Sequence, residues 1–138
     1  YQVFPHMVVS EDCCMLFQLV DRAACVACID RPIYDCTDNE ASSTHQTFTL
    51  THIENILTTR KIMCETCAPY PSLAEDLDRN VTFTILRLYC YPFPKETLRK
   101  LFEKYGLSRY GTWRHGWKVL SLRQFVGTYI SALIKRQA

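Results

Sequence analysis

Two cysteine pairs, Cys25-Val26-Ala27-Cys28 and Cys64-Glu65-Thr66-Cys67, constrain this chain more than any other feature of its sequence. Each C-x-x-C pair can wrap around one metal ion and supply two thiolates, so two pairs complete a tetrahedral Zn²⁺ shell. The pattern therefore predicts a structural zinc site that joins segments 35 residues apart. Protein would fill all four positions, which leaves no place for a metal-activated water and argues against zinc hydrolysis. The predicted ligands are Cys25, Cys28, Cys64 and Cys67.

The cysteines also allow other interpretations. Disulfides or redox-active dithiols would use the same residues, and Cys36, His45 or His52 could replace one zinc ligand. Eight cysteines that include two C-x-x-C pairs fit a reducing compartment better than a secreted disulfide framework. We therefore expect an intracellular protein of the nucleus or cytoplasm, in preference to a secreted one. The sequon Asn80-Val81-Thr82 is the one feature that favours secretion.

Charge is divided unevenly along the chain. Residues 1–94 contain 6 Lys/Arg and 12 Asp/Glu, a net charge of −6, whereas residues 95–138 contain 10 and 2, a net charge of +8. A basic C-terminal part on an acidic body indicates a polyanionic partner for the basic part. The chain has no run of about 18 apolar residues, so neither a transmembrane helix nor a membrane partner is expected.

Residues 1–93 are expected to form an α+β body. Ser10 predicts a helix N-cap, and the spacing of Leu16 and Leu19 predicts that this helix buries an apolar face. The segment Thr51-His52-Ile53-Glu54 has the pattern of a capping box and predicts a helix that carries Cys64. Residues 3–9 and 47–50 are expected to be short strands, and residues 29–46 a solvent-exposed loop.

The segment 81–91 (VTFTILRLYCY) is rich in β-branched and aromatic residues and predicts a central strand. The expected fold is therefore α+β: a small zinc-stapled domain with a short sheet and several helices. Residues 94–138 are expected to close it as a basic helix–loop–helix packed on the body. Pro94 suits the first position (N1) of a helix, Gly106 its left-handed C-cap, and Ser121-x-x-Gln124 the start of the last helix.

The predicted loop 107–120 interleaves aromatic, basic and glycine residues. Cations can meet phosphates, flat rings can stack on bases, and glycines allow a close approach of the backbone. In the alternative interpretation, Trp113 and Trp117 fill the core between the helices while the cations face water. The predicted nucleic-acid-binding residues are Lys100, Lys104, Arg109, Tyr110, Trp113, Arg114, Trp117 and Lys118.

Part of this region resembles a known DNA-binding module. The pattern Leu98-x-x-Leu101-x-x-x-Tyr105-Gly106-Leu107-Ser108-x-x-Gly111 is similar to the first half of a SAP motif, a helix–loop–helix with which family members grip the DNA backbone. The resemblance covers residues 95–133, with extra residues between Gly111 and Leu122. It implies DNA binding, with phosphates contacted by Lys100, Lys104, Arg109, Arg114 and Lys118.

A second resemblance points to a protein partner. Ser121-Leu122-x-x-x-Val126-x-x-x-Ile130 is similar to the helix that SOCS-box proteins offer to Elongin C. It implies a protein–protein adaptor that recruits a host complex through Leu122, Val126 and Ile130. The acidic body is the other candidate surface for a protein partner.

No sequence motif indicates catalysis. H-E-x-x-H, G-x-S-x-G, G-x-x-x-x-G-K-[ST] and G-x-G-x-x-G are all absent. We expect a non-enzymatic, zinc-binding regulatory or adaptor protein that binds nucleic acid through its basic, aromatic C-terminal surface. Compact cysteine-rich proteins of this kind also occur as viral accessory factors. A protein-only adaptor and a secreted, disulfide-stapled effector are the alternatives.

Overall fold

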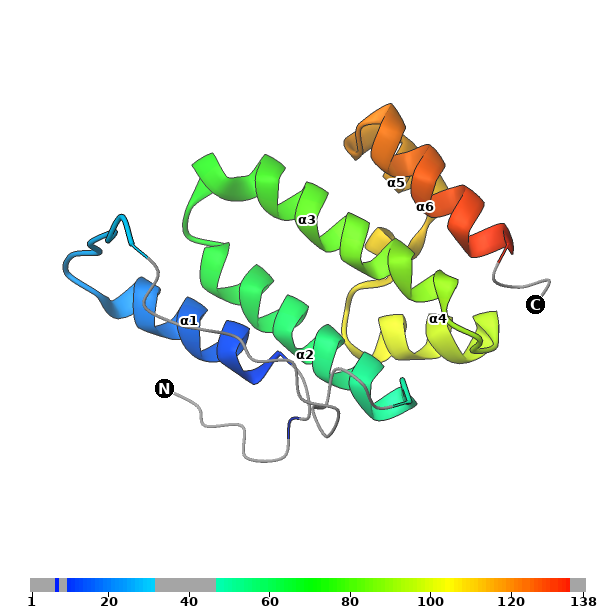
Figure 1. Cartoon of the computed structure of the whole chain (residues 1–138), viewed down its shortest axis with the longest axis horizontal. Helices are drawn as coiled ribbons and strands as arrows, with labels where there is room; N and C mark the ends of the chain where they lie inside the picture. The colour runs from blue at the N-terminus through cyan, green and yellow to red at the C-terminus, as the bar shows by residue number, and fades with distance from the viewer. Residues whose placement is uncertain (1–6, 8–9, 32–46, 135–138) are drawn as a thin grey trace.

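The computed structural model describes residue 7 and residues 10–31 and 47–134 (Figure 1). It contains no strand in these residues, so the predicted α+β fold is wrong and the domain they form is all-helical. The helices are α1 (Glu11–Arg22), α2 (Leu50–Cys67), α3 (Ala74–Arg87), α4 (Lys95–Lys104), α5 (Trp113–Val119) and α6 (Leu122–Ile134). Short 3₁₀ turns connect some of them: η2 (Pro71–Leu73), η3 (Leu88–Cys90) and η4 (Ser108–Gly111).

The helices are arranged around α3. In Figure 1, α1 and α2 lie side by side and run in the same direction, and α3 folds back against α2. The Tyr70 hydroxyl donates a 3.0 Å hydrogen bond to Asp21 Oδ1, which joins the ends of α1 and α2. Helices α5 and α6 and the turn η4 pack against α3. The C-terminal region is therefore not a separate appendage but part of the packing around α3.

Apolar side chains from α2, α3, α4 and the elements that follow form one core. Burying a Leu, Ile or Phe side chain stabilises a fold by about 1.5–3 kcal/mol, so a cluster of this size holds the helices together. The largest members are fully or almost fully buried: Ile53, Leu57, Val81, Ile85, Leu86, Leu98 and Phe102.

The predicted central strand is instead the second half of α3, continued by η3. Val81, Thr82, Ile85 and Leu86 are all fully buried, a spacing of one, four and five residues that belongs to a helix face. Four of the five residues in VTFTI are β-branched, so this segment has the composition of a strand although it is helical. Packing of this face against the core overrides their intrinsic β preference.

Helix α2 begins earlier than predicted. Thr49 is its N-cap, and the Thr49 N–H donates a 3.2 Å hydrogen bond to His52 Nδ1, so a histidine completes the capping box in place of Glu54. Residues 47–50 do not form the predicted strand, since Leu50 is already helical. The Phe48 ring stacks on Tyr91, with centroids 3.8 Å apart, and both rings pack against the core.

Helix α1 forms as predicted but does not bury the predicted face. Leu16 is 60% exposed and Leu19 is also exposed. The buried residue is Cys14, whose Sγ lies 3.2 Å from Thr59 Oγ1 on α2. Ser10 occupies the N-cap position at φ 66°, and its side chain makes no capping hydrogen bond. The contact between α1 and α2 thus includes Cys14 and Thr59, and it leaves Leu16 and Leu19 exposed.

The described residues do not form the predicted zinc site, and zinc binding by the cysteine pairs stays a prediction. Cys25 and Cys28 are exposed beyond α1, whereas Cys64 and Cys67 are half-buried on α2. Nowhere in residues 10–31 and 47–134 do three or more His, Cys, Asp or Glu side chains form a group that could hold a metal ion. Cys64 Sγ faces the Tyr110 hydroxyl at 3.8 Å instead. The core is held by apolar packing.

The seven cysteines in the described residues are free thiols, and Cys36 and His45 lie outside those residues. His52 caps α2 rather than approaching a cysteine pair. No helix in the part of the chain that the structure describes is both long enough and apolar enough to cross a membrane.

Candidate nucleic-acid interface

Helix α6 begins where the sequence predicts, and α4 begins one residue later than predicted. Pro94 is the N-cap of α4, and Gly106 follows the helix at φ 70°, the left-handed conformation that glycine adopts without strain. At the start of α6, the Gln124 N–H donates to Ser121 Oγ and the Ser121 N–H donates to Gln124 Oε1, both at 3.3 Å. The predicted capping box is therefore confirmed.

The predicted loop between these helices is itself largely helical. It contains η4 and α5, and Thr112 caps α5 by accepting a 3.3 Å hydrogen bond from the His115 N–H. Gly116 is buried where α5 crosses α3, and a Cβ there would collide with Leu86 Cδ1. This glycine serves the packing of two helices rather than the close approach of a ligand.

The turn η4 and helix α5 bring several basic side chains to one cavity of about 330 Å³, here named the basic cavity. Arg114 and Lys118 are one helical turn apart and both are exposed. Neither forms an ion pair with any residue that the structure describes. The cavity is lined by Arg109, Thr112, Arg114, His115 and Lys118.

One carboxylate on α3 orients two of these side chains. Asp78 Oδ1 lies 3.0 Å from His115 Nε2 and 3.6 Å from Arg109 Nη2. Arg109 also donates a 2.6 Å hydrogen bond to the Tyr110 hydroxyl, and this bond raises the pKa of Arg109. The guanidinium is thus fixed and fully charged, while Arg114 and Lys118 keep their charge toward solvent.

The other predicted residues are divided between surface and core. Tyr110 is buried, and Trp113 packs against Tyr89, Phe125 and Tyr129, with the Tyr129 centroid 5.0 Å away. The alternative prediction that tryptophan fills the core is therefore confirmed for Trp113. It is wrong for Trp117, which is 62% exposed.

The two lysines predicted on α4 lie outside the basic cavity. Lys104 is exposed and pairs with Glu54 of α2 at 2.8 Å, so its charge is partly neutralised. Lys100 is exposed. The structure therefore brings together Arg109, Arg114 and Lys118 from the predicted set, and it adds His115. The one sequence signal for His115 is that it lies among basic residues, next to Arg114.

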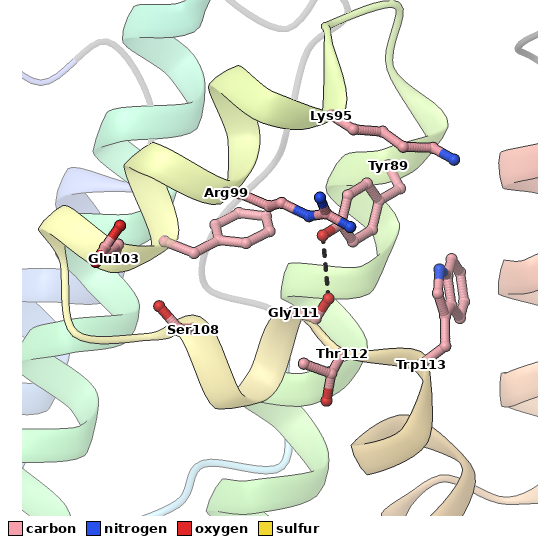
Figure 2. A pocket seen from close by; sticks show the side chains of 9 residues that line it. Tyr89, Lys95, Arg99, Glu103, Ser108, Gly111, Thr112 and Trp113 are labelled. Carbon is pink, nitrogen blue, oxygen red and sulfur yellow. Dashed lines mark hydrogen bonds between the residues drawn. The ribbon is translucent and has the colours of Figure 1, made fainter.

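A second cavity of about 460 Å³ lies on the other side of Thr112, which lines both (Figure 2). Figure 2 shows Arg99 extending from α4 toward the Tyr89 ring, whose hydroxyl donates a 3.0 Å hydrogen bond to the Gly111 carbonyl. Lys95 lines the same cavity. Neither Lys95 nor Arg99 was among the predicted residues, although the prediction included Lys100 and Lys104 of the same helix.

No protein-family model, curated protein or solved structure matches this chain. The SAP and SOCS-box resemblances stay predictions that rest on the residues quoted for them. The three residues of the second resemblance are at the surface, since Leu122, Val126 and Ile130 are 67%, 39% and 47% exposed. They are available to a partner rather than buried in the core.

Proposed function

We propose that this protein binds nucleic acid without catalysis and holds backbone phosphates in the basic cavity. The observation that carries the proposal is the convergence of three cations and a histidine, from η4 and α5, on one cavity. Phosphate binding needs fixed positive charge together with N–H donors, and arginine supplies both in a planar fork. Arg109, Arg114 and Lys118 are the residues proposed to contact phosphates.

The cavity combines one oriented cation with two freely accessible ones. Asp78 and Tyr110 hold Arg109 in place, which lowers the entropy lost when it meets a phosphate. Arg114 and Lys118 are exposed, so they reach a polyanion without first breaking an ion pair within the described residues. Released counterions would supply most of the binding free energy.

An exposed indole stands beside these cations. Trp117 directly precedes Lys118 and follows Arg114 by three residues, and its ring packs on Phe125 at 5.2 Å. That packing steadies a ring that remains 62% exposed. Stacking of a base on an aromatic ring contributes about 1–3 kcal/mol in single-stranded complexes. A single strand, with bases free to stack, therefore suits this surface better than a duplex.

The test is fluorescence anisotropy with labelled oligonucleotides of about 20 nucleotides, as single-stranded DNA, single-stranded RNA and duplex DNA. The variant Arg114→Glu/Lys118→Glu should bind at least tenfold more weakly, with a salt dependence lower by about two charges. The matched control is Arg22→Glu/Lys61→Glu, the same charge reversal at exposed residues of α1 and α2. Equal losses in both variants, or binding that survives in the first, would contradict the proposal.

A further inference from the structure

Helix α6 exposes an apolar stripe along its outer side, here named the α6 face. Its residues recur at intervals of three and four, so they lie on one side of the helix. Thirteen residues span about 20 Å, enough for a partner helix of similar length to lie along it. The α6 face consists of Leu122, Val126, Tyr129, Ile130 and Leu133, each of them exposed.

Two hollows flank this helix. One, of about 410 Å³, lies between α6 and the end of α3 and is lined among others by Arg87, Arg123 and Gly127. The other, of about 180 Å³, lies on the opposite side between Lys95 and Leu133. At Gly127 a Cβ would meet nothing within 4 Å, so the backbone itself is open to close approach. The α6 face is therefore a ridge between two hollows, and a second helix can lie along it.

The charge around the α6 face has one sign. No residue that lines either hollow is acidic, and the sequence contains no Asp or Glu after Glu103. Arg87 lies over the Phe83 ring at 5.6 Å, and neither Arg87 nor Arg123 forms an ion pair with another described residue. An apolar stripe bordered only by cations is complementary to an apolar stripe bordered by carboxylates.

The same charges argue against two other occupants. A second copy docking through this face would bring together two surfaces bordered by cations and by no carboxylate, and like-charge juxtaposition costs several kcal/mol. An anionic lipid surface would satisfy the cations but would leave the two hollows unfilled, because a flat surface rests on the ridge alone. Both considerations favour a partner helix.

We propose that the α6 face and its flanking hollows dock an amphipathic helix of another protein, whose apolar stripe is bordered by Asp or Glu. Arg123 and Arg87 would pair with carboxylates on one side of that stripe. Lys95 would pair with carboxylates on its other side. The surface is distinct from the basic cavity, so the two proposals can fail separately.

The experiment uses the full chain and a labelled helical peptide of about 16 residues, with a leucine stripe bordered by Glu. Its twin has Lys in place of every Glu. The acidic peptide should bind at least tenfold more tightly than the basic one. Leu122→Glu should weaken its binding by about tenfold or more, because it places a carboxylate on the apolar stripe, where it repels the Glu residues of the peptide. The matched control is Leu16→Glu on α1, where a similarly exposed leucine receives the same change, and it should bind like the original chain.

Three outcomes would overturn the proposal. The first is equal binding of both peptides, or no binding of the acidic one. The second is sedimentation equilibrium that shows a dimer which Leu122→Glu dissociates. The third is binding of the chain to phosphatidylserine vesicles that Leu122→Glu abolishes and with which the acidic peptide does not compete. Circular dichroism of each variant separates lost binding from lost folding.

Discussion

His115 and Asp78 join the basic cavity to the core: Nε2 lies 3.0 Å from the carboxylate oxygen, and both side chains are only 24% exposed. The contact links α5 to α3 across 37 positions of sequence. The same oxygen lies 3.6 Å from Arg109 Nη2. One acidic residue therefore contacts two of the side chains that line the cavity, and its charge partly offsets that of Arg109.

Removing that acidic charge should tighten nucleic-acid binding. In Asp78→Asn the shape is kept, but the carboxylate no longer competes with phosphate for Arg109, so affinity at low salt should rise severalfold. The free energy of unfolding should fall by about 1 kcal/mol or less, because the ion pairs are partly exposed. Anisotropy titration and urea denaturation measure the two effects. Weaker binding in this variant would mean that Asp78 matters more as a positioning residue than as a countercharge.

Two helical glycines should respond in opposite directions to alanine. At Gly116 the new methyl group would collide with Leu86, and overpacking of this kind costs about 1–3 kcal/mol. At Gly127 a Cβ has open space, so the change should stabilise the chain by up to about 1 kcal/mol through helix propensity. Urea denaturation of the pair measures both. Equal effects at the two positions would show that α5 does not approach α3 as closely as described.

The helical core should not depend on zinc. It is built from apolar side chains, and Cys25 and Cys28 are exposed outside it. Treatment with a strong chelator should therefore leave the helical circular dichroism and the melting temperature unchanged. Native mass spectrometry before and after treatment reports whether the cysteine pairs hold a metal, which stays a prediction. A large fall in melting temperature on chelation would restore the zinc staple as a structural element.

Thiol reactivity should follow burial. Cys25 and Cys28 are exposed and should be alkylated first, while Cys14 is fully buried and should react only on unfolding. Burial raises the pKa of Cys64 above its ordinary value of 9.0, so its thiolate forms later than in the unfolded chain. The protonated thiol is thus favoured in the fold. This contribution to stability is intact below about pH 9 and declines as the pH rises further.

Peptide mapping after timed alkylation at neutral pH measures the order of reaction. Urea denaturation at pH 8 and at higher pH measures the stability that Cys64 contributes, with Cys64→Ser as the control that removes the titrating group. Early alkylation of Cys14, or a pH dependence that the Ser variant retains in full, would contradict the described burial.

Local signals predicted the ends of the last helices and the composition of the candidate interface. Helix caps act within one turn of backbone, so neighbouring residues are enough to predict them. This holds for Pro94, Gly106 and the Ser121–Gln124 capping box. The basic residues of α5 are close in sequence as well as in space. Their clustering was therefore visible without a fold.

Contacts between residues far apart in the sequence could not be predicted from such local signals. The segment 81–91 has the composition of a strand, yet most of it belongs to α3, which packs as a helix against α2, α5 and α6. The leucines of α1 have the spacing of a buried face, yet that face is exposed because α1 meets α2 through Cys14 and Thr59. Regular spacing predicts a helix but not which neighbour will cover it.

The sequence by itself determined the helix caps, the basic C-terminal region and the residues from which a phosphate site could be built. Tertiary structure alone decided that Asp78 lies beside that site, that Trp113 packs against the core while Trp117 is exposed, and that Cys25 and Cys28 are exposed whereas Cys64 packs against the core. The physical reason is that caps and charge density are properties of neighbouring residues. Burial and ion pairing are free energies of contact between residues tens of positions apart, which only the packed helices bring together.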